Sequence, residues 1–263
     1  MKHKLMKGDC LDKMASLPAN SVDLILCDLP YGTTACRWDS VIPMGPLWKE
    51  YRRLIKPSGV VVLNADQPFT SLLIQEALDL FRYNLVWNKC GITGHLNAKR
   101  KPLRQTEDIL VFFQSSNSTY NPLMRTGRMR LKGGRKDKPD QTYGKNAGPS
   151  VLSDQYYPTN LIEFSNAANK ASRVHPTEKP VALNEYLIKT YSNEGDVVLD
   201  NCFGSCSTGI ACLNTNRVFI GIEKDPDYFE LGKNRFLSYT TPDARPVASS
   251  THPASARPGP APK

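Results

Sequence analysis

Four consecutive residues, Asp28-Leu29-Pro30-Tyr31, bring together groups that could activate an amino group on a planar base. They follow the apolar run Val22–Cys27, which is typical of a buried strand that ends at a polar, proline-stiffened stop. Ligands bind at this edge of an open α/β sheet. The carboxylate and a free backbone carbonyl could accept the two N–H bonds of an exocyclic amino group, while the tyrosine ring stacks on the base. A simple turn after a strand would also explain these residues, because Asp and Pro favour turns.

A second segment, residues 197–209, predicts a strand, a tight turn and the start of a helix. Gly204 would relieve the steric limits on φ in this turn and let a ligand approach the backbone. Ser207 or Thr208 could cap the helix. Glu223 ends the next predicted strand, where its carboxylate could accept hydrogen bonds from ribose hydroxyls. The turn departs from the dinucleotide fingerprint at its middle glycine, so it favours a nucleoside ligand without a pyrophosphate.

Composition narrows the class of protein. The chain has 263 residues, 40% of them hydrophobic, enough for one large domain with an insertion or for two small domains. Its formal net charge of +9 favours a polyanionic partner such as nucleic acid. The cysteines are scattered and odd in number, so we expect reduced thiols. We see no signal peptide and no apolar run near the roughly 20 residues that span a bilayer, so we expect a soluble cytoplasmic protein without a membrane partner.

Alternating apolar runs and amphipathic stretches predict the elements that position both segments, in an α/β fold with a mostly parallel sheet. Expected strands are residues 4–7, 22–27, 59–63, 83–87, 109–113, 197–200 and 218–223. Expected helices are residues 10–16, 45–55, 70–80 and 181–192, one that begins at Ser207 and a last one that ends at Phe236.

Three polar stretches interrupt or follow this pattern. Between Arg125 and Lys138, basic residues and glycines accompany a single acid, which predicts a mobile cationic loop. A second basic cluster precedes it, and both clusters could follow the phosphates of a nucleic acid. The basic residues concerned are Lys99, Arg100, Lys101 and Arg104, then Arg125, Arg128, Arg130, Lys132, Arg135 and Lys136. Residues 239–263 are rich in Pro, Ala and Ser and are predicted to be disordered.

The order of these segments resembles that of the β-group amino-methyltransferases of DNA, which use S-adenosylmethionine. In that family the catalytic motif comes first, a target-recognition region follows, and the cofactor motif comes last. Three further segments, Gly8-Asp9-Cys10, Trp87-Asn88-Lys89 and residues 175–180, fit the same order. The resemblance implies a Rossmann-like, circularly permuted sheet. Its expected parts are a catalytic half (1–114), a target-recognition insert (115–174), a cofactor-binding half (175–238) and the tail (239–263).

The resemblance also implies roles for the catalytic motif. Asp28 and the Leu29 carbonyl would accept the two amino hydrogens of adenine and aim the nitrogen lone pair at the methyl group. Tyr31 would stack on the base after it has been flipped out of duplex DNA, and Pro30 completes the motif.

For the cofactor, the resemblance implies that Asp9 contacts the adenine, that Glu223 holds the ribose and that Lys179 lies near the methionine end. The full set of implied cofactor residues is Asp9, Lys179, Asp200, Cys202, Phe203, Gly204, Ser205, Cys206, Ser207, Thr208 and Glu223. We expect no metal, because Cys202 and Cys206 lie within the cofactor turn and no second cysteine pair follows at zinc-site spacing.

The chain departs from the family pattern in three places. Leu29 stands where the family often has a second proline, and Asn201-Cys202 replaces a common Pro-Phe. Cys206 stands where a glycine is usual, so a positive φ at this position would carry a steric cost.

The predicted reaction is methyl transfer from S-adenosylmethionine to the N6 amino group of adenine in double-stranded DNA, in a bacterial or phage-infected cell. An aspartate at the start of the motif favours adenine over cytosine-N4, since family members that act on cytosine more often begin with serine. The alternatives are transfer to an RNA amino group, a DNA-binding homologue with weak or no catalysis, and a nicotinamide-dependent oxidoreductase. A homodimer and a cognate restriction nuclease stay open as further partners.

Overall fold

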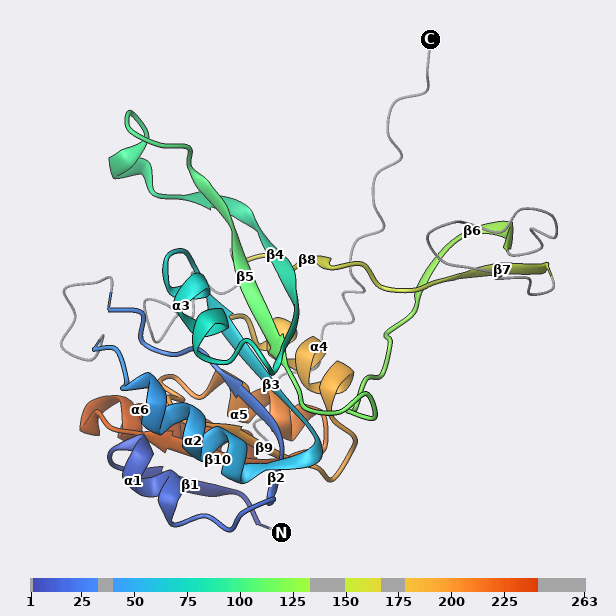
Figure 1. Ribbon diagram of the computed structural model, residues 1–263. Coiled ribbons are helices and arrows are strands. Elements are labelled where there is room, and N and C mark those ends of the chain that lie inside the picture. Colours follow the sequence, from blue (N-terminus) through green and yellow to red (C-terminus); the bar gives the residue numbers. More distant parts are fainter. Residues whose placement is uncertain (1, 33–39, 133–149, 167–177, 241–263) are drawn as a thin grey trace. The chain divides into compact units, whose positions relative to one another are not determined.

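The computed structural model describes residues 2–32, 40–132, 150–166 and 178–240. Within these ranges the chain forms two compact units (Figure 1). The larger unit runs to Asn121 and resumes at Asn160, whereas the smaller unit extends from Pro122 to Thr159. The smaller unit therefore spans fewer residues than the predicted insert (115–174), because residues on either side of it belong to the larger unit.

The larger unit is built on an eight-stranded sheet with the order β1-β10-β9-β2-β3-β5-β4-β8. Neighbouring strands from β1 to β3 are parallel. β5 runs antiparallel to both β3 and β4, and β8 pairs with β4 in parallel. The predicted mostly parallel sheet is therefore confirmed. The strands are β1 Lys4–Lys7, β2 Val22–Cys27, β3 Ile55–Ala65, β4 Phe81–Thr93, β5 Arg104–Phe112, β8 Leu161–Glu163, β9 Val197–Asp200 and β10 Val218–Glu223.

One strand pair joins the two halves of the chain. β2 lies beside β9, with Leu24 opposite Val198 and Ile25 opposite Leu199. Both strands are short apolar runs, as expected for parallel strands that are covered on both faces. Because the two strands are parallel, the polar segments that follow them meet at the same edge of the sheet.

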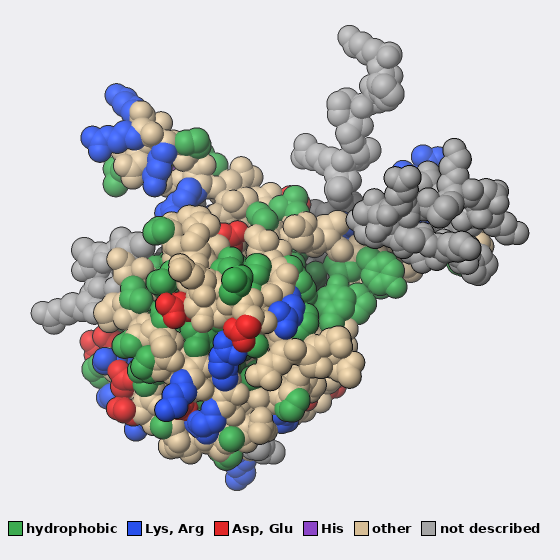
Figure 2. All heavy atoms as spheres, viewed as in Figure 1, with side chains coloured by type: hydrophobic (Ala, Val, Ile, Leu, Met, Phe, Trp, Pro, Cys, Tyr) green, Lys and Arg blue, Asp and Glu red, His purple; other side chains and the backbone are tan. Residues whose placement is uncertain are grey.

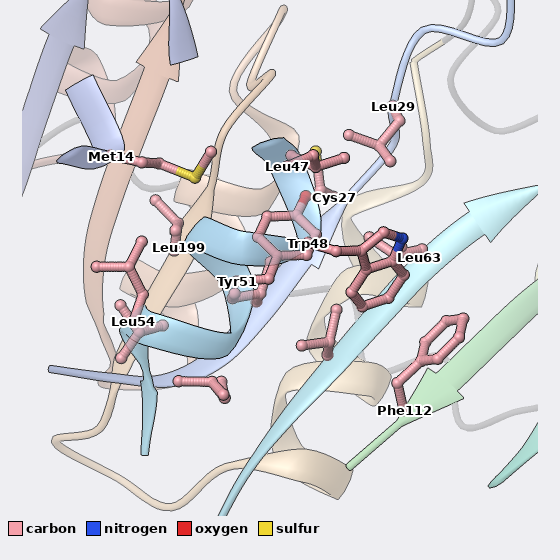
Figure 3. Packing of buried hydrophobic residues seen from close by; sticks show 14 of the residues in the cluster. Met14, Cys27, Leu29, Leu47, Trp48, Tyr51, Leu54, Leu63, Phe112 and Leu199 are labelled. Atoms are coloured by element: carbon pink, nitrogen blue, oxygen red, sulfur yellow. The ribbon is translucent and has the colours of Figure 1, made fainter. Parts of the chain in front are cut away.

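Helices cover both faces of the sheet, and each face has its own hydrophobic core. Side chains alternate along β2, so that Ile25 and Cys27 pack with α1 to α3 and Leu24 and Leu26 pack with α4 to α6. Figure 3 shows the first core, which includes the fully buried Tyr51 of α2. The helices are α1 Cys10–Ala15, α2 Met44–Leu54, α3 Phe69–Glu76, α4 Val181–Tyr191, α5 Ser207–Asn214 and α6 Pro226–Thr240, with a 3-10 helix η1 at His95–Asn97.

Most predicted elements of the larger unit are confirmed, and the differences concern their ends. β4 and β5 are longer than predicted and form an antiparallel hairpin that carries η1 near its tip (Figure 1). β8 falls within the predicted insert but extends the sheet beside β4. The helix predicted for residues 70–80 ends at Glu76, because Ala77 leaves the helical conformation with φ −142° and ψ 45°.

The smaller unit is a two-stranded antiparallel sheet of β6 (Arg125–Lys132) and β7 (Val151–Tyr156). The predicted mobile cationic loop is therefore wrong for residues 125–132. Basic and apolar residues alternate from Arg128 onward, and this period of two is typical of a strand. The density of charge and glycine obscures the period in the sequence. The rest of that predicted loop, residues 133–138, lies outside the described residues.

The last helix, α6, extends to Thr240, beyond its predicted end at Phe236. The remainder of the predicted disordered tail, residues 241–263, lies outside the described residues. Within the described ranges, no helix is both long and apolar enough to cross a membrane.

Candidate active site

A cavity of about 1000 Å³ opens in the larger unit, at the edge where the parallel strands end. Its walls include Asp28 after β2, Asn64 near the end of β3, Asp200 at the end of β9 and Glu223 at the end of β10. The two segments that the sequence indicates therefore share one cavity, as expected for the carboxyl edge of an open α/β sheet.

Both oxygens of the Asp28 carboxylate have partners in this cavity. The Tyr31 hydroxyl donates to Oδ1 at 2.8 Å, and Lys179 Nζ donates to Oδ2 at 2.6 Å. Lys179, which precedes α4, also lies with its Nζ 3.4 Å from Glu107 Oε2 on β5. On the other side of Glu107, Lys89 of β4 donates to Oε1 at 3.2 Å. Asp28, Glu107, Lys89 and Lys179 thus form a charged quartet with no formal net charge.

Mutual interaction within the charged quartet offsets the cost of burial. Burial alone would lower the pKa of Lys179, but the carboxylates of Asp28 and Glu107 outweigh burial and raise it. Burial alone would raise the pKa of Glu107, but Lys179 and Lys89 outweigh burial and lower it. Lys179 is therefore cationic and Glu107 anionic at neutral pH. Burial, assisted by Asp28, also raises the pKa of Tyr31, so its hydroxyl stays protonated as a donor.

Packing fixes the orientation of the motif. The Tyr31 ring stacks on Phe69 of α3, with 5.1 Å between the ring centroids and 28° between the planes. The Leu29 side chain is buried in the core, while Leu29 and Pro30 also line the cavity. A buried leucine therefore anchors the segment at the position where the family often has a proline.

Two acids organise the turn after β9. Asp200 Oδ1 accepts the Cys202 N–H at 3.1 Å, and Glu223 Oε2 accepts the Gly204 N–H at 2.9 Å. The other oxygen, Glu223 Oε1, accepts the Asp225 N–H at 2.9 Å. Burial raises the pKa of Asp200 to about 6 and also raises that of Glu223. Each oxygen of an ionised carboxylate has two lone pairs, so Glu223 can accept further hydrogen bonds from a ligand.

Cys206 shapes the turn through its backbone. Cys206 immediately precedes α5 and has φ 63° and ψ 31°. The structure therefore has the positive φ at Cys206 that the sequence comparison with the family suggested. Its side chain is fully buried and does not line the cavity, unlike the other residues expected to bind the cofactor. Among the described residues, no side chain caps the start of α5, so the predicted cap by Ser207 or Thr208 is wrong. Their hydroxyls instead accept hydrogen bonds from Asn184 of α4, at 3.2 and 3.4 Å.

Asp9 lines the cavity from the start of α1. Its Oδ1 caps the helix by accepting the Leu11 N–H at 3.0 Å, and its Oδ2 pairs with Lys224 at 3.1 Å. Burial alone would raise the pKa of Asp9, but the hydrogen bonds from Lys224 and from the Leu11 N–H, together with the charge of Lys224, outweigh burial and lower it. The other expected cofactor residues that line the cavity are Lys179, Asp200, Cys202, Phe203, Gly204, Ser205, Ser207, Thr208 and Glu223. Among the described residues, no group of three His, Cys, Asp or Glu side chains is placed to hold a metal ion.

Glu107 and Asn64 are two of the polar cavity residues that the sequence patterns do not reveal. Glu107 is not found from strand ends because β5 runs antiparallel to β3. The first residues of β5, and not its last, therefore lie near the ligand edge. Asn64 is buried near the end of β3, and its Oδ1 accepts no hydrogen bond from any described residue. It follows an apolar run in the same way as Asp28 does, so the same strand-end signal could have found it. Asn64 Oδ1 offers a ligand a further acceptor.

The first basic cluster lies on the β4–β5 hairpin, where Figure 2 shows a group of basic side chains. Lys101 and Arg104 line the cavity, and Arg104 pairs with Asp66. Lys99 and Arg100 are exposed nearer the tip. The hairpin thus connects the cavity with an exposed cationic surface.

The second basic cluster lies on β6 of the smaller unit. Arg125, Arg128 and Arg130 are exposed there. Lys132 lies over the Tyr156 ring, with Nζ 3.5 Å from the ring centroid. Arg135 and Lys136, which belong to the same predicted cluster, lie outside the described residues.

Comparison with protein families and curated proteins gives concordant matches. Residues 22–234 match the N6_N4_Mtase family, described as DNA methylase. The type II methyltransferase M.HpaI of Haemophilus parainfluenzae is 30% identical over 251 residues, which cover 90% of this chain and 75% of that protein. The DNA adenine methyltransferase YhdJ of Escherichia coli (strain K12) is 29% identical over 254 residues, which cover 88% of this chain and 81% of that protein.

Solved structures share the fold. The PvuII DNA methyltransferase (cytosine-N4-specific) matches with a TM-score of 0.64 at 17% identity, over 90% of this chain and 86% of that one. The M1.HpyAVI–SAM complex matches with a TM-score of 0.58 at 22% identity, over 88% of this chain and 98% of that one. The predicted methyltransferase fold is therefore confirmed.

Proposed function

The chain belongs to the DNA methylase family of N6 and N4 amino-methyltransferases, and on this premise we propose that it methylates the N6 amino group of adenine in duplex DNA, with S-adenosylmethionine as the methyl donor. The observation that carries the proposal is the shared cavity, in which Asp28 and the turn around Gly204 lie at one edge of the sheet. Such an enzyme would act on DNA in the cytoplasm of a bacterial or phage-infected cell.

The residues of the cavity fit the methyl donor. Glu223 retains lone pairs for a ribose diol, and Asn64 Oδ1 offers a buried acceptor. Asp9 and Asp200 add negative charge to the walls, which suits a ligand that carries a sulfonium cation. The donor supplies an electrophilic methyl group on that sulfur. The positive φ at Cys206 turns the backbone around Gly204 without placing the cysteine side chain in the cavity.

Activation of the amino group falls to Asp28 and Leu29. The lone pair of an adenine amino nitrogen is delocalised into the ring, so the group is a weak nucleophile. Acceptance of its two N–H bonds by the Asp28 carboxylate and the Leu29 carbonyl would localise the lone pair and direct it at the methyl carbon. As the N–C bond forms and the C–S bond breaks, the electron pair of the broken bond stays on sulfur. Asp28 would take the proton that the nitrogen then loses.

Tyr31 and the basic residues would hold the substrate. The Tyr31 ring, which stacks on Phe69, offers a stacking surface to a base that has left the duplex. Unpairing that base costs a few kcal/mol. The cationic surface of the β4–β5 hairpin would contact phosphates beside the cavity. The smaller unit, with its exposed arginines on β6, would recognise the target sequence.

Adenine is favoured over cytosine for two reasons. The motif begins with aspartate, and one relative is described as a DNA adenine methyltransferase. Cytosine-N4 is the second candidate, because its amino group presents the same two N–H bonds to the same two acceptors.

The experiment is to incubate the protein with labelled S-adenosylmethionine and duplex DNA of mixed sequence, digest the DNA to nucleosides and identify the labelled nucleoside by mass spectrometry. We expect label in N6-methyldeoxyadenosine. Label in N4-methyldeoxycytidine would replace adenine by cytosine as the substrate. Donor binding without any labelled nucleoside would refute methyl transfer to DNA.

A further inference from the structure

Lys179 lies between two carboxylates, of which only Asp28 belongs to the catalytic motif. Its Nζ is 2.6 Å from Asp28 Oδ2 and 3.4 Å from Glu107 Oε2. The lysine side chain is 10% exposed and the Glu107 side chain 19%, so water screens these interactions only weakly. The ammonium group therefore has two anionic partners within reach of a small side-chain movement.

The present position of Lys179 conflicts with the chemistry proposed for Asp28. The Tyr31 hydroxyl already occupies Oδ1, and Lys179 occupies Oδ2. A charge-assisted hydrogen bond from an ammonium group draws electron density from the oxygen that should accept the amino N–H. It also places a positive charge beside the amino nitrogen that a cationic methyl donor must approach. Asp28 Oδ2 therefore becomes a stronger acceptor for the amino N–H once Lys179 has left it.

Glu107 offers the lysine a second position. Glu107 Oε1 accepts a hydrogen bond from Lys89 at 3.2 Å. Glu107 Oε2 is buried, and its contact with Lys179 at 3.4 Å is longer than the roughly 2.7–2.9 Å of a charge-assisted hydrogen bond. A shift of Nζ toward Glu107 would complete that bond. The charged quartet keeps the same formal charge in both arrangements, so the shift moves no net charge into or out of the cavity.

We propose that Glu107 is a positioning residue that receives Lys179 when the target base enters, and so frees Asp28 Oδ2 to accept the amino N–H. The inference rests on the proposed methyl transfer to an amino group. It gives Glu107 a role in the reaction without contact to substrate or donor.

The test is a double-mutant cycle with Glu107→Gln and Lys179→Met, assayed by kcat and KM for methyl transfer to duplex DNA. A neutral amide cannot hold the ammonium group, so Glu107→Gln should lower kcat at least about 10-fold in the Lys179 background. In the Lys179→Met background no lysine needs to be displaced, so the same change should alter kcat less than about 2-fold. Glu107→Asp keeps the charge and should recover part of the lost kcat.

Binding and structural measurements separate this role from a merely structural one. The affinity for S-adenosylmethionine, measured by calorimetry, should be the same for wild type and Glu107→Gln within about 2-fold. A crystal structure with S-adenosylhomocysteine and target DNA should place Lys179 Nζ closer to Glu107 than to Asp28. Equal losses of kcat in the two backgrounds, or a lysine that stays on Asp28 in that complex, would overturn the inference. A wild-type protein that transfers no methyl group would instead defeat the proposed function, and this inference with it.

Discussion

Tyr51→Phe should weaken both the fold and the binding of the methyl donor, because one buried hydroxyl links α2 to the turn after β9. Tyr51 Oη donates to Asn201 Oδ1 at 2.6 Å, and the two residues are 0% and 1% exposed. Asn201 directly follows β9 and lines the cavity. The substitution removes only the hydroxyl, since the ring packs edge-on against Trp48 at 5.5 Å in the core of Figure 3 and can stay in place.

The cost follows from the group that is left behind. An intact hydrogen bond of this kind contributes about 1 kcal/mol net, but an acceptor left buried without a partner costs about 1–3 kcal/mol. We therefore expect Tyr51→Phe to lower the free energy of unfolding by about 2 kcal/mol and Tm by roughly 4–8 °C. Burial raises the pKa of Tyr51, so its hydroxyl is protonated across the neutral range and the loss should not depend on pH there.

Urea denaturation, thermal melting and calorimetric titration with S-adenosylmethionine measure these effects. Tyr83→Phe is the matched control, because its hydroxyl lies 3.2 Å from that of Tyr191 and neither residue lines the cavity. We expect the control to lose less than about 1 kcal/mol of stability and no donor affinity. A Tyr51→Phe protein as stable as wild type, or one whose donor affinity falls no more than that of the control, would show that this bond does not couple the fold to donor binding.

Three further predictions address Asp28, the buried acid Asp200 and the cationic surface of the β4–β5 hairpin. Asp28→Ala should abolish methyl transfer in the nucleoside assay and leave donor affinity nearly unchanged; an equal loss of binding would show that Asp28 is not the catalytic acceptor. Burial raises the pKa of Asp200 from 3.8 to about 6, so between about pH 4 and 6 the folded protein holds a proton that the unfolded chain has released. Wild type should therefore lose stability relative to Asp200→Asn as pH rises through this range. Urea denaturation at several pH values measures this difference, and parallel stability curves for the two proteins would contradict it. Replacing Lys99, Arg100 and Lys101 together by Ala should weaken DNA binding. The slope of log K against log salt concentration should become shallower by roughly one unit for each phosphate that the protein no longer neutralises. Fluorescence anisotropy measures this slope, and an unchanged slope would show that the hairpin does not contact DNA.

The strands that carry the site are predictable because a short apolar run that ends at a polar segment fits few structures other than a buried strand. β2, β9 and β10 have the bounds expected from the sequence. Each is a short apolar run in the interior of the sheet, where parallel strands are covered on both faces, and each ends at a polar or glycine-bearing segment. Asp28, Asp200 and Glu223 inherit their positions at the ligand edge from these strand ends.

The charged quartet is not predictable in the same way. Lys179 and Asp28 are 151 residues apart in sequence, and no local pattern reports their contact. Glu107 reaches the cavity only because β5 is antiparallel, a property that depends on the connection from β4 and not on the residues of β5 itself. The alternation in β6 is a local signal, but its basic residues also fit a solvated loop, so only the pairing with β7 decides between them.

The two segments that form the cavity come from the first and the last part of the chain, and the sheet brings them together. The backbone of β2 pairs with that of β9, and neighbouring strands lie about 4.8 Å apart, so the Asp28 segment and the turn around Gly204 are adjacent whatever their order along the chain. Strand pairing sets this distance but not the orientation of the side chains. At the cavity, the bonds of Asp28 with Lys179 and of Tyr51 with Asn201 each join the first half of the chain to the last. Substitutions at these bonds should therefore change methyl transfer or donor affinity while the sheet stays intact.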